Sequence, residues 1–123
     1  MKICHINIKS IRNNKDTLEH YIRENNIDIV MLNETWLKPN ENININGYKS
    51  HVLNRKDGYG GVGFLVKNQI SARPTIHPKY KPIEIIEIEF GNTTKYNLLS
   101  MYIPPNTKHD AITNKFRNII KDF

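Results

Sequence analysis

The chain of 123 residues has one cysteine and no apolar run long enough to cross a bilayer. A single cysteine, Cys4, excludes an internal disulfide and a cysteine-based zinc site, so we interpret it as a small buried hydrophobe. Its scarcity predicts a reducing compartment. Strand-like sequence directly follows Met1, where a signal peptide would stand. We therefore expect an intracellular protein, nuclear or cytoplasmic, with no membrane partner.

Acidic residues are also few, because 12 Asp and Glu stand against 18 Lys and Arg, a formal charge of +6. This excess favours a polyanionic partner such as nucleic acid. The lysines are scattered along the chain, however, and scattered lysines are nearly as typical of an ordinary solvated surface. With 38% apolar residues, the length suits one domain with one core, spanning residues 1–123.

The apolar pattern of the first third predicts a strand–helix–strand unit. Residues 2–8 alternate as a two-faced strand, and Asn13 and Asn14 indicate a turn. Residues 15–25 have helical spacing. Residues 27–32 form a nearly unbroken apolar run, typical of a strand covered on both faces. The two strands are expected to pair in parallel.

The rest of the chain predicts two hairpins and a final helix. Apolar segments within residues 52–66 flank a glycine-rich turn. Prolines are expected to keep residues 71–82 irregular, and residues 84–103 form the second pair of strands. Thr107 and Asp110 then resemble a capping box that opens a helix running to the terminus.

Two oxygen-bearing side chains stand where the predicted parallel strands end. Asn7 lies near the carboxyl end of the first strand, and Glu34 lies just beyond that of the second. They should converge, because open α/β sheets bind ligands at this edge, and oxygen ligands suit magnesium. From spacing alone, a turn-forming Asn7 and a Glu34 that faces a helix dipole remain the better interpretation.

Longer sequence motifs favour a functional role for Asn7 and Glu34 over this structural interpretation. Six of them occur along the chain, at residues 7–13, 28–37, 47–48, 60–67, 84–86 and 100–105. In this order they resemble the landmarks of the endonuclease/exonuclease/phosphatase superfamily, in particular the apurinic-like endonuclease domain of non-long-terminal-repeat (non-LTR) retrotransposons. The most specific are Glu-Thr-Trp at 34–36 and Tyr-Ile-Pro-Pro at 102–105. The resemblance covers nearly the whole chain.

The resemblance implies the amino-terminal half of a deoxyribonuclease-like, four-layer α/β/β/α sandwich, with one mixed sheet and helices on one face. It implies metal-dependent phosphodiester hydrolysis that nicks one strand of DNA. Glu34 would be a metal carboxylate, Asn7 would help to position the metal and the scissile phosphate, and Tyr102 would orient the phosphate. Arg12 and Arg55 are candidates for contacts with the DNA backbone, although a surface role is the simpler interpretation of each.

Two later motifs of the superfamily, Asp-x-Asn and a terminal Ser-Asp-His, are absent from the sequence. Asp122 and Phe123 begin like the first motif, but they follow Pro105 too closely and continue an apolar helical face. The absent motifs supply further metal ligands and the base that activates water, and general-base help alone is worth ~10²–10⁴-fold. We therefore expect an incomplete, inactive fragment that binds Mg²⁺ or Mn²⁺ weakly.

Two alternatives remain open. A non-catalytic, basic nucleic-acid-binding fragment would bind DNA in a salt-sensitive way without cutting it. A phosphatase of the same superfamily would act on a phospholipid or inositol phosphate, although the retrotransposon-like motifs argue against it. The expected partners are DNA and the missing carboxyl-terminal half. Removing that half should leave one apolar sheet face exposed, so we also expect self-association.

Overall fold

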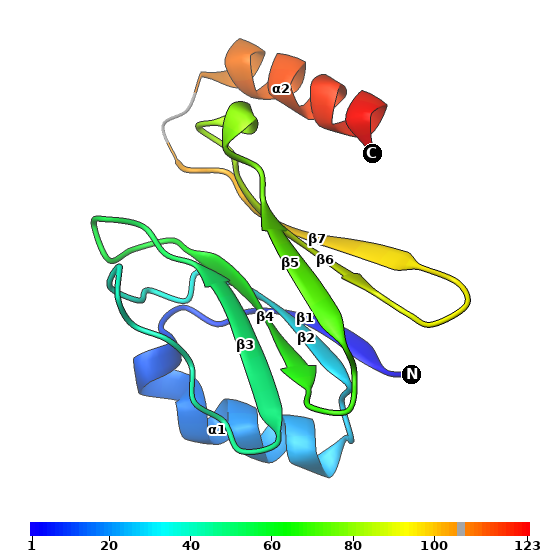
Figure 1. Ribbon diagram of the computed structural model, residues 1–123. Coiled ribbons are helices and arrows are strands. Elements are labelled where there is room, and N and C mark those ends of the chain that lie inside the picture. The colour runs from blue at the N-terminus through cyan, green and yellow to red at the C-terminus, as the bar shows by residue number, and fades with distance from the viewer. Residues whose placement is uncertain (106–107) are drawn as a thin grey trace.

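A computed structural model describes residues 1–105 and 108–123, which fold into four layers (Figure 1). The elements in chain order are β1 (Ile3–Asn7), α1 (Ile11–Glu24), β2 (Ile29–Asn33), β3 (Tyr48–Leu53), β4 (Val62–Lys67), β5 (Ala72–Ile76), a 3-10 turn η1 (Pro78–Tyr80), β6 (Glu84–Phe90), β7 (Tyr96–Tyr102) and α2 (His109–Asp122). Helix α1 covers a mixed sheet, a second sheet lies on its other face, and α2 lies beyond that sheet. This is the predicted α/β/β/α architecture, with the expected mixed sheet joined by an antiparallel one.

The mixed sheet has the strand order β1-β2-β4-β3, and the second sheet has the order β5-β6-β7. Strands β1 and β2 are parallel, as predicted, while every other pair is antiparallel. Asn7 lies level with Asn33, so β1 and β2 end together. The loops that follow them therefore leave the sheet at the same edge.

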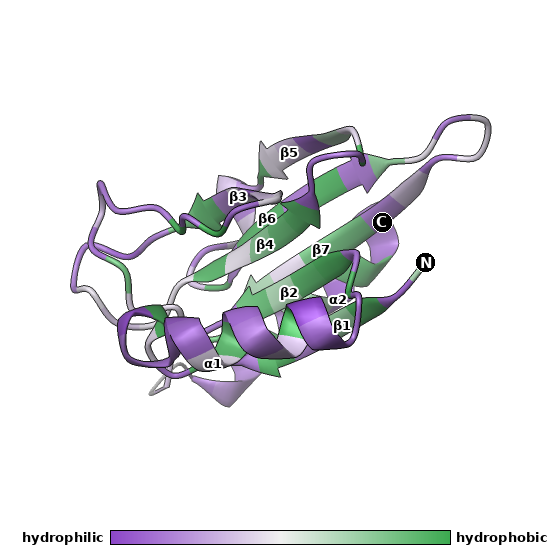
Figure 2. Cartoon of the chain, turned by 90° about the horizontal axis from the view of Figure 1, so that it is seen from below, coloured by the Kyte–Doolittle hydropathy of each residue, from purple (hydrophilic) through white to green (hydrophobic). Residues whose placement is uncertain are grey.

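Three apolar layers hold the sandwich together, and the mixed sheet contributes to two of them. Between α1 and the mixed sheet, Leu18 and Ile22 of the helix pack with Leu32 of β2. Figure 2 shows the corresponding apolar stripe on α1. The layer between the two sheets consists of Ile29, Val62, Phe64, Val66, Ile86, Ile88 and Phe90. Because β2 supplies residues to both layers, the prediction of a strand covered on both faces is confirmed.

Helix α1 begins earlier than its apolar spacing indicated. The Ser10 hydroxyl accepts a hydrogen bond from the Asn13 N–H at 3.2 Å and caps the helix. The Asn14 amide donates to the Ile8 and Ser10 carbonyls at 3.0 and 3.1 Å. The prediction of a turn at Asn13 and Asn14 was therefore wrong, because both residues belong to the first helical turn and Ser10 carries the start signal.

Two further expectations need correction or lie outside the described residues. Residues 71–82 are not irregular throughout, because β5 includes Pro74. Proline is tolerated there because β5 is an edge strand, where one N–H needs no partner. Thr107 of the predicted capping box lies outside the described residues. Helix α2 starts after Lys108, whose side chain makes no capping hydrogen bond.

The uncovered apolar surface is narrower than a whole sheet face. Strand β7 packs against β2 and β4, while Ile3, His5 and Asn7, on the inner side of β1 that faces away from α1, are exposed. On α2, Phe116 and Ile120 are also exposed. Within the described part of the chain, no helix has the length and apolarity to cross a membrane.

Candidate functional site

Three segments meet at the edge where β1 and β2 end and β4 begins. The loop after β1, the loop after β2 and the glycines before β4 are tied together by main-chain hydrogen bonds. These are Ser10 N–H to Glu34 O (3.0 Å), Ile11 N–H to Thr35 O (2.9 Å), Glu34 N–H to Gly61 O (2.8 Å) and Trp36 N–H to Gly60 O (3.0 Å). These hydrogen bonds fix the three segments relative to one another, although all three are loops.

The backbone of this edge is strained. Of the non-glycine residues with positive φ in the described chain, Lys9 (45°), Ser10 (86°), Glu34 (56°) and Trp36 (55°) lie here, and Asn26 lies elsewhere. Such conformations cost about 1–3 kcal/mol each and cluster at functional sites, where the surrounding structure enforces them. The hydrogen bonds among the three segments provide that enforcement and fix the direction in which Glu34 leaves β2.

Gly60 and Gly61 allow the segments to approach closely. A Cβ on Gly61 would lie 2.5 Å from Oγ1 of Thr35, a buried hydroxyl with no hydrogen-bond partner among the described residues. A Cβ on Gly60 would lie 2.6 Å from Cδ of Arg55 and 2.7 Å from Cε1 of Tyr102. Gly60 therefore connects the Glu34 loop to the end of β7 in the other sheet.

Asn7, Glu34 and Tyr102 lie at this common edge. Asn7 is the last residue of β1, Glu34 directly follows β2, and Tyr102 is the last residue of β7. The Asn7 side chain is exposed, and those of Glu34 and Tyr102 are half-buried. The fold thus places at one edge three residues that are up to 95 positions apart in the sequence, Asn7 to Tyr102.

The oxygen donors at this edge suit a hydrated divalent cation. Glu34 offers a carboxylate and Asn7 an amide oxygen, and Mg²⁺ commonly takes one or two carboxylates while keeping several waters. In the part of the chain that the structure describes, no group of three His, Cys, Asp or Glu residues could hold a metal. Binding of Mg²⁺ or Mn²⁺ at this edge stays a prediction, with Glu34 and Asn7 as the residues that would hold the ion.

Arg12 lies in the first turn of α1, close to the same edge. Its guanidinium donates to both carboxylate oxygens of Glu41 at 2.7 Å, and its side chain is 56% exposed. This contact with Arg12 holds the pKa of Glu41 below its usual value. A phosphate that binds Arg12 would have to replace Glu41.

Arg55, on the loop between β3 and β4, is held more firmly. Its guanidinium lies 3.0 Å from Asp57 and 3.5 Å from Glu84, and its Cζ lies 5.4 Å from the centre of the Tyr102 ring. Burial raises the pKa of Glu84. Arg55 and Glu84 also line a cavity of about 950 Å³. Tyr102 is thus packed between Gly60 and this arginine.

Sequence reasoning missed Tyr59. This residue is 64% exposed on the β3–β4 loop, and its ring meets Trp36 edge-on at 5.8 Å between centroids. Tyr59 therefore adds an exposed aromatic side chain to the loops at this edge. The available signal was an aromatic residue inside a turn of glycines and Asp57, where no core position is expected.

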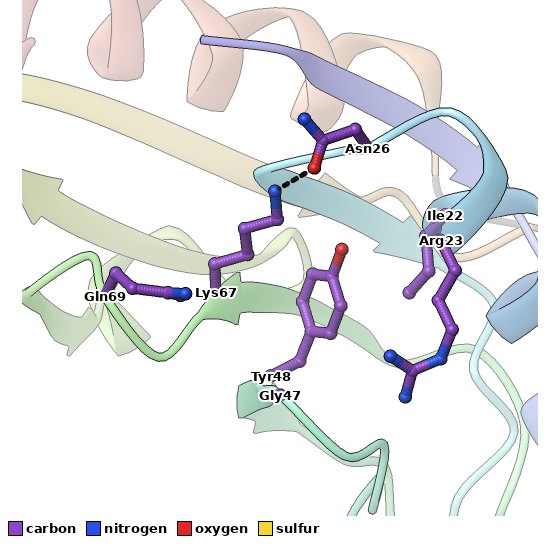
Figure 3. A pocket seen from close by; sticks show the side chains of 7 residues that line it. All are labelled: Ile22, Arg23, Asn26, Gly47, Tyr48, Lys67 and Gln69. Atoms are coloured by element: carbon purple, nitrogen blue, oxygen red, sulfur yellow. Dashed lines mark hydrogen bonds between the residues drawn. The ribbon is translucent and has the colours of Figure 1, made fainter.

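A second pocket lies at the opposite edge of the mixed sheet, where β4 ends (Figure 3). Lys67 and Arg23 line it, but both cations are engaged. Lys67 donates to Asn26 and pairs with Asp28 at 3.2 Å, and Arg23 pairs with Glu19 at 3.1 Å. The contacts of Lys67 tie the end of β4 to the turn between α1 and β2, and Asn26 of this pocket also has a positive φ, 52°.

Comparison with known protein families shows which family the chain belongs to. The sequence matches the Endonuclease/Exonuclease/phosphatase family over residues 4–115. The chain belongs to this family. None of the curated proteins compared with it matches.

Solved structures with the same fold include nucleases. The endonuclease domain of TRAS1, a telomere-specific non-LTR retrotransposon, has a TM-score of 0.68 at 13% identity. An AP endonuclease from Archaeoglobus fulgidus has a TM-score of 0.68 at 20% identity. The AP endonuclease LMAP from Leishmania major has a TM-score of 0.70 at 14% identity. At these identities the likeness shows the fold alone.

The chain spans about half the length of these structures. The matches cover 97%, 98% and 98% of this chain, but only 53%, 49% and 46% of the TRAS1, Archaeoglobus and Leishmania chains, respectively. This coverage agrees with the resemblance to the amino-terminal half of a family domain.

Proposed function

We propose that this chain forms the amino-terminal half of a metal-dependent DNA endonuclease of the non-LTR retrotransposon type, which nicks one strand of DNA. The observation that carries the proposal is the meeting of Asn7, Glu34 and Tyr102 at one strained edge of a family fold. A role in DNA cleavage by such an element agrees with the intracellular, nuclear or cytoplasmic location expected from the sequence.

The three side chains have distinct roles in this proposal. The Glu34 carboxylate and the Asn7 amide oxygen hold Mg²⁺ or Mn²⁺, with water completing the coordination. When bound, the ion neutralises charge on a phosphate oxygen. The Tyr102 hydroxyl donates a hydrogen bond to the phosphate, and its ring is kept in place by Gly60 and Arg55.

We propose that the DNA backbone crosses the loops around this edge. Arg12 and Arg55 contact phosphates by exchanging a carboxylate partner, Glu41 or Asp57, for a phosphate oxygen. The exposed Tyr59 ring lies on the same loop as Arg55. The formal charge of +6 adds a long-range attraction that salt should weaken.

The other half of the active site is proposed to come from a carboxyl-terminal part that continues the sandwich. The exposed inner side of β1 and the free edge of β7 are the surfaces it would cover. By itself the chain offers one carboxylate and one amide to a metal and has no base for water. We therefore expect no nicking by this chain alone.

A non-catalytic nucleic-acid-binding fragment is the second candidate. It is favoured by the formal charge of +6, which attracts nucleic acid without a metal. The two candidates differ in whether the metal takes part in DNA binding.

Equilibrium binding to a short DNA duplex, with and without Mg²⁺, separates them. The first proposal expects affinity that falls steeply with salt, a Mg²⁺-dependent gain in affinity, and loss of that gain in Glu34→Gln. Binding that is indifferent to both Mg²⁺ and Glu34→Gln would support the non-catalytic fragment. Mg²⁺-dependent nicking that Glu34→Gln abolishes would show that this chain needs no second half.

A further inference from the structure

The Asn33 side chain crosses from one sheet to the other. Asn33 is the last residue of β2, and its Nδ2 donates to the Met101 carbonyl of β7 at 2.8 Å. Its Oδ1 accepts from the Ser100 hydroxyl at 3.2 Å, and this hydroxyl also lies 3.2 Å from the Leu32 carbonyl. The two sheets are thus joined by a polar bridge between residues that are 68 positions apart.

The bridge lies in surroundings that are otherwise apolar. Ser100 is 2% exposed, and the inter-sheet layer beside it is made of Ile, Val and Phe side chains. Apolar contacts are non-directional, so such a layer tolerates small shifts of one sheet over the other. Hydrogen bonds depend on distance and angle, and a buried amide without partners is costly. The Asn33 bridge therefore determines how the sheets are aligned at this end.

Both ends of the bridge are one residue from the proposed site. Asn33 directly precedes Glu34, and Met101 directly precedes Tyr102. The Glu34 loop is also attached to Gly61, while Tyr102 contacts Gly60. A shift of β7 relative to β2 would therefore change the spacing between the metal carboxylate and the phosphate-binding hydroxyl.

We propose that Asn33 is a positioning residue that sets Tyr102 relative to Glu34. Its function in catalysis rests on the proposed nuclease activity, whereas its effect on geometry does not. Alignment matters because a misplacement of about 1 Å can cost about 10²-fold in rate. Neither Asn33 nor Ser100 needs to touch DNA or metal in this role.

Three variants of the full chain test the proposal without metal or DNA. Asn33→Ala removes both hydrogen bonds of the amide. Asn33→Asp keeps its size and its acceptor, but a carboxylate cannot donate to the Met101 carbonyl. Ser100→Ala is the matched control, because it removes the neighbouring hydroxyl and leaves the bond between Asn33 and Met101.

The measurement is the NMR nuclear Overhauser effect between the Tyr102 ring and Gly60, which are in contact in the folded chain. We expect it to be lost in Asn33→Ala and retained in Ser100→Ala. In Asn33→Asp it should be absent at neutral pH and return in acid, since a protonated carboxyl can donate to Met101. A role in stability alone would leave the contact in place in every variant that remains folded.

Persistence of the contact in folded Asn33→Ala would overturn the proposal, and so would its loss in Ser100→Ala alone. If Asn33→Ala fails to fold, Asn33→Asp still tests the proposal. A Tyr102–Gly60 contact that is the same at neutral and acid pH in this variant would contradict the proposed role. Failure of the nuclease proposal would be seen separately, in DNA and metal binding, while these NMR results stayed as expected.

Discussion

Gly60 shows that the close approach of segments at the candidate site depends on a residue without a side chain. Its φ of +60° is unfavourable for other residues, and an added Cβ would meet both Arg55 and Tyr102. No other glycine of the chain lies against two side chains of the proposed site. The closeness of Tyr102 to the Glu34 loop is therefore encoded by glycine.

Gly60→Ala should destabilise the chain by more than a left-handed alanine does by itself, which is about 1–2 kcal/mol. Gly58→Ala is the matched control, because Gly58 also has positive φ, +75°, but an added Cβ would meet nothing within 4 Å. Urea unfolding of both variants isolates the packing contribution. Equal losses would mean that the contact of Gly60 with Tyr102 is not tight.

Single residues differed in how far the sequence could reveal them. The position of Asn7 and Glu34 at one sheet edge could be predicted from apolar periodicity, but their proposed roles came from the family resemblance and stay predictions. The contacts of Asn33 could not be predicted, because its partners Ser100 and Met101 are 67 and 68 positions away, and a hydrogen bond between two sheets leaves no local pattern. Arg55 was proposed as a DNA contact, but its stacking on Tyr102 depends on a loop conformation that spacing does not define.

At the scale of elements, the start of α1 has a testable cause. Ser10 caps the helix through its hydroxyl while its φ is +86°. Ser10→Ala should cost about 0.5–2 kcal/mol of unfolding free energy, because it removes the cap. Ser10→Gly should cost less, since glycine is an acceptable cap and tolerates positive φ. Denaturant unfolding measures both, and a more stable Ser10→Ala than Ser10→Gly would contradict this account.

The elements themselves were predictable where one period ran through the whole segment. The parallel pair of β1 and β2 and the hairpin of β6 and β7 followed from such patterns. Strand β5 was missed because Pro74 was taken as a break, and only the position of β5 at the sheet edge makes that proline harmless. Sheet order is a tertiary property, so the sequence could not reveal it.

At the scale of the whole molecule, the exposed inner side of β1 carries the expectation of self-association. Ile3 is 43% exposed there, next to a free strand edge. Exposed edges and apolar surface promote association between chains. Ile3→Lys should therefore reduce self-association in sedimentation velocity experiments.

Ile120→Lys serves as its control, because Ile120 is 65% exposed but lies on helix α2, away from any free strand edge. We expect this variant to associate as the natural chain does. If the natural chain is a monomer at all accessible concentrations, the exposed side of β1 is not a contact surface for a second copy.

The central claim is that Asn7 and Glu34 form the metal-binding part of a nuclease site. Titration with Mn²⁺, followed by paramagnetic broadening of backbone amide signals, tests it most directly because weak binding is sufficient. The account predicts broadening centred on Asn7, Glu34 and their neighbouring loops, and its loss in Glu34→Gln. Broadening centred elsewhere, for example around Asp28 at the opposite edge, or unchanged broadening in Glu34→Gln, would contradict the claim.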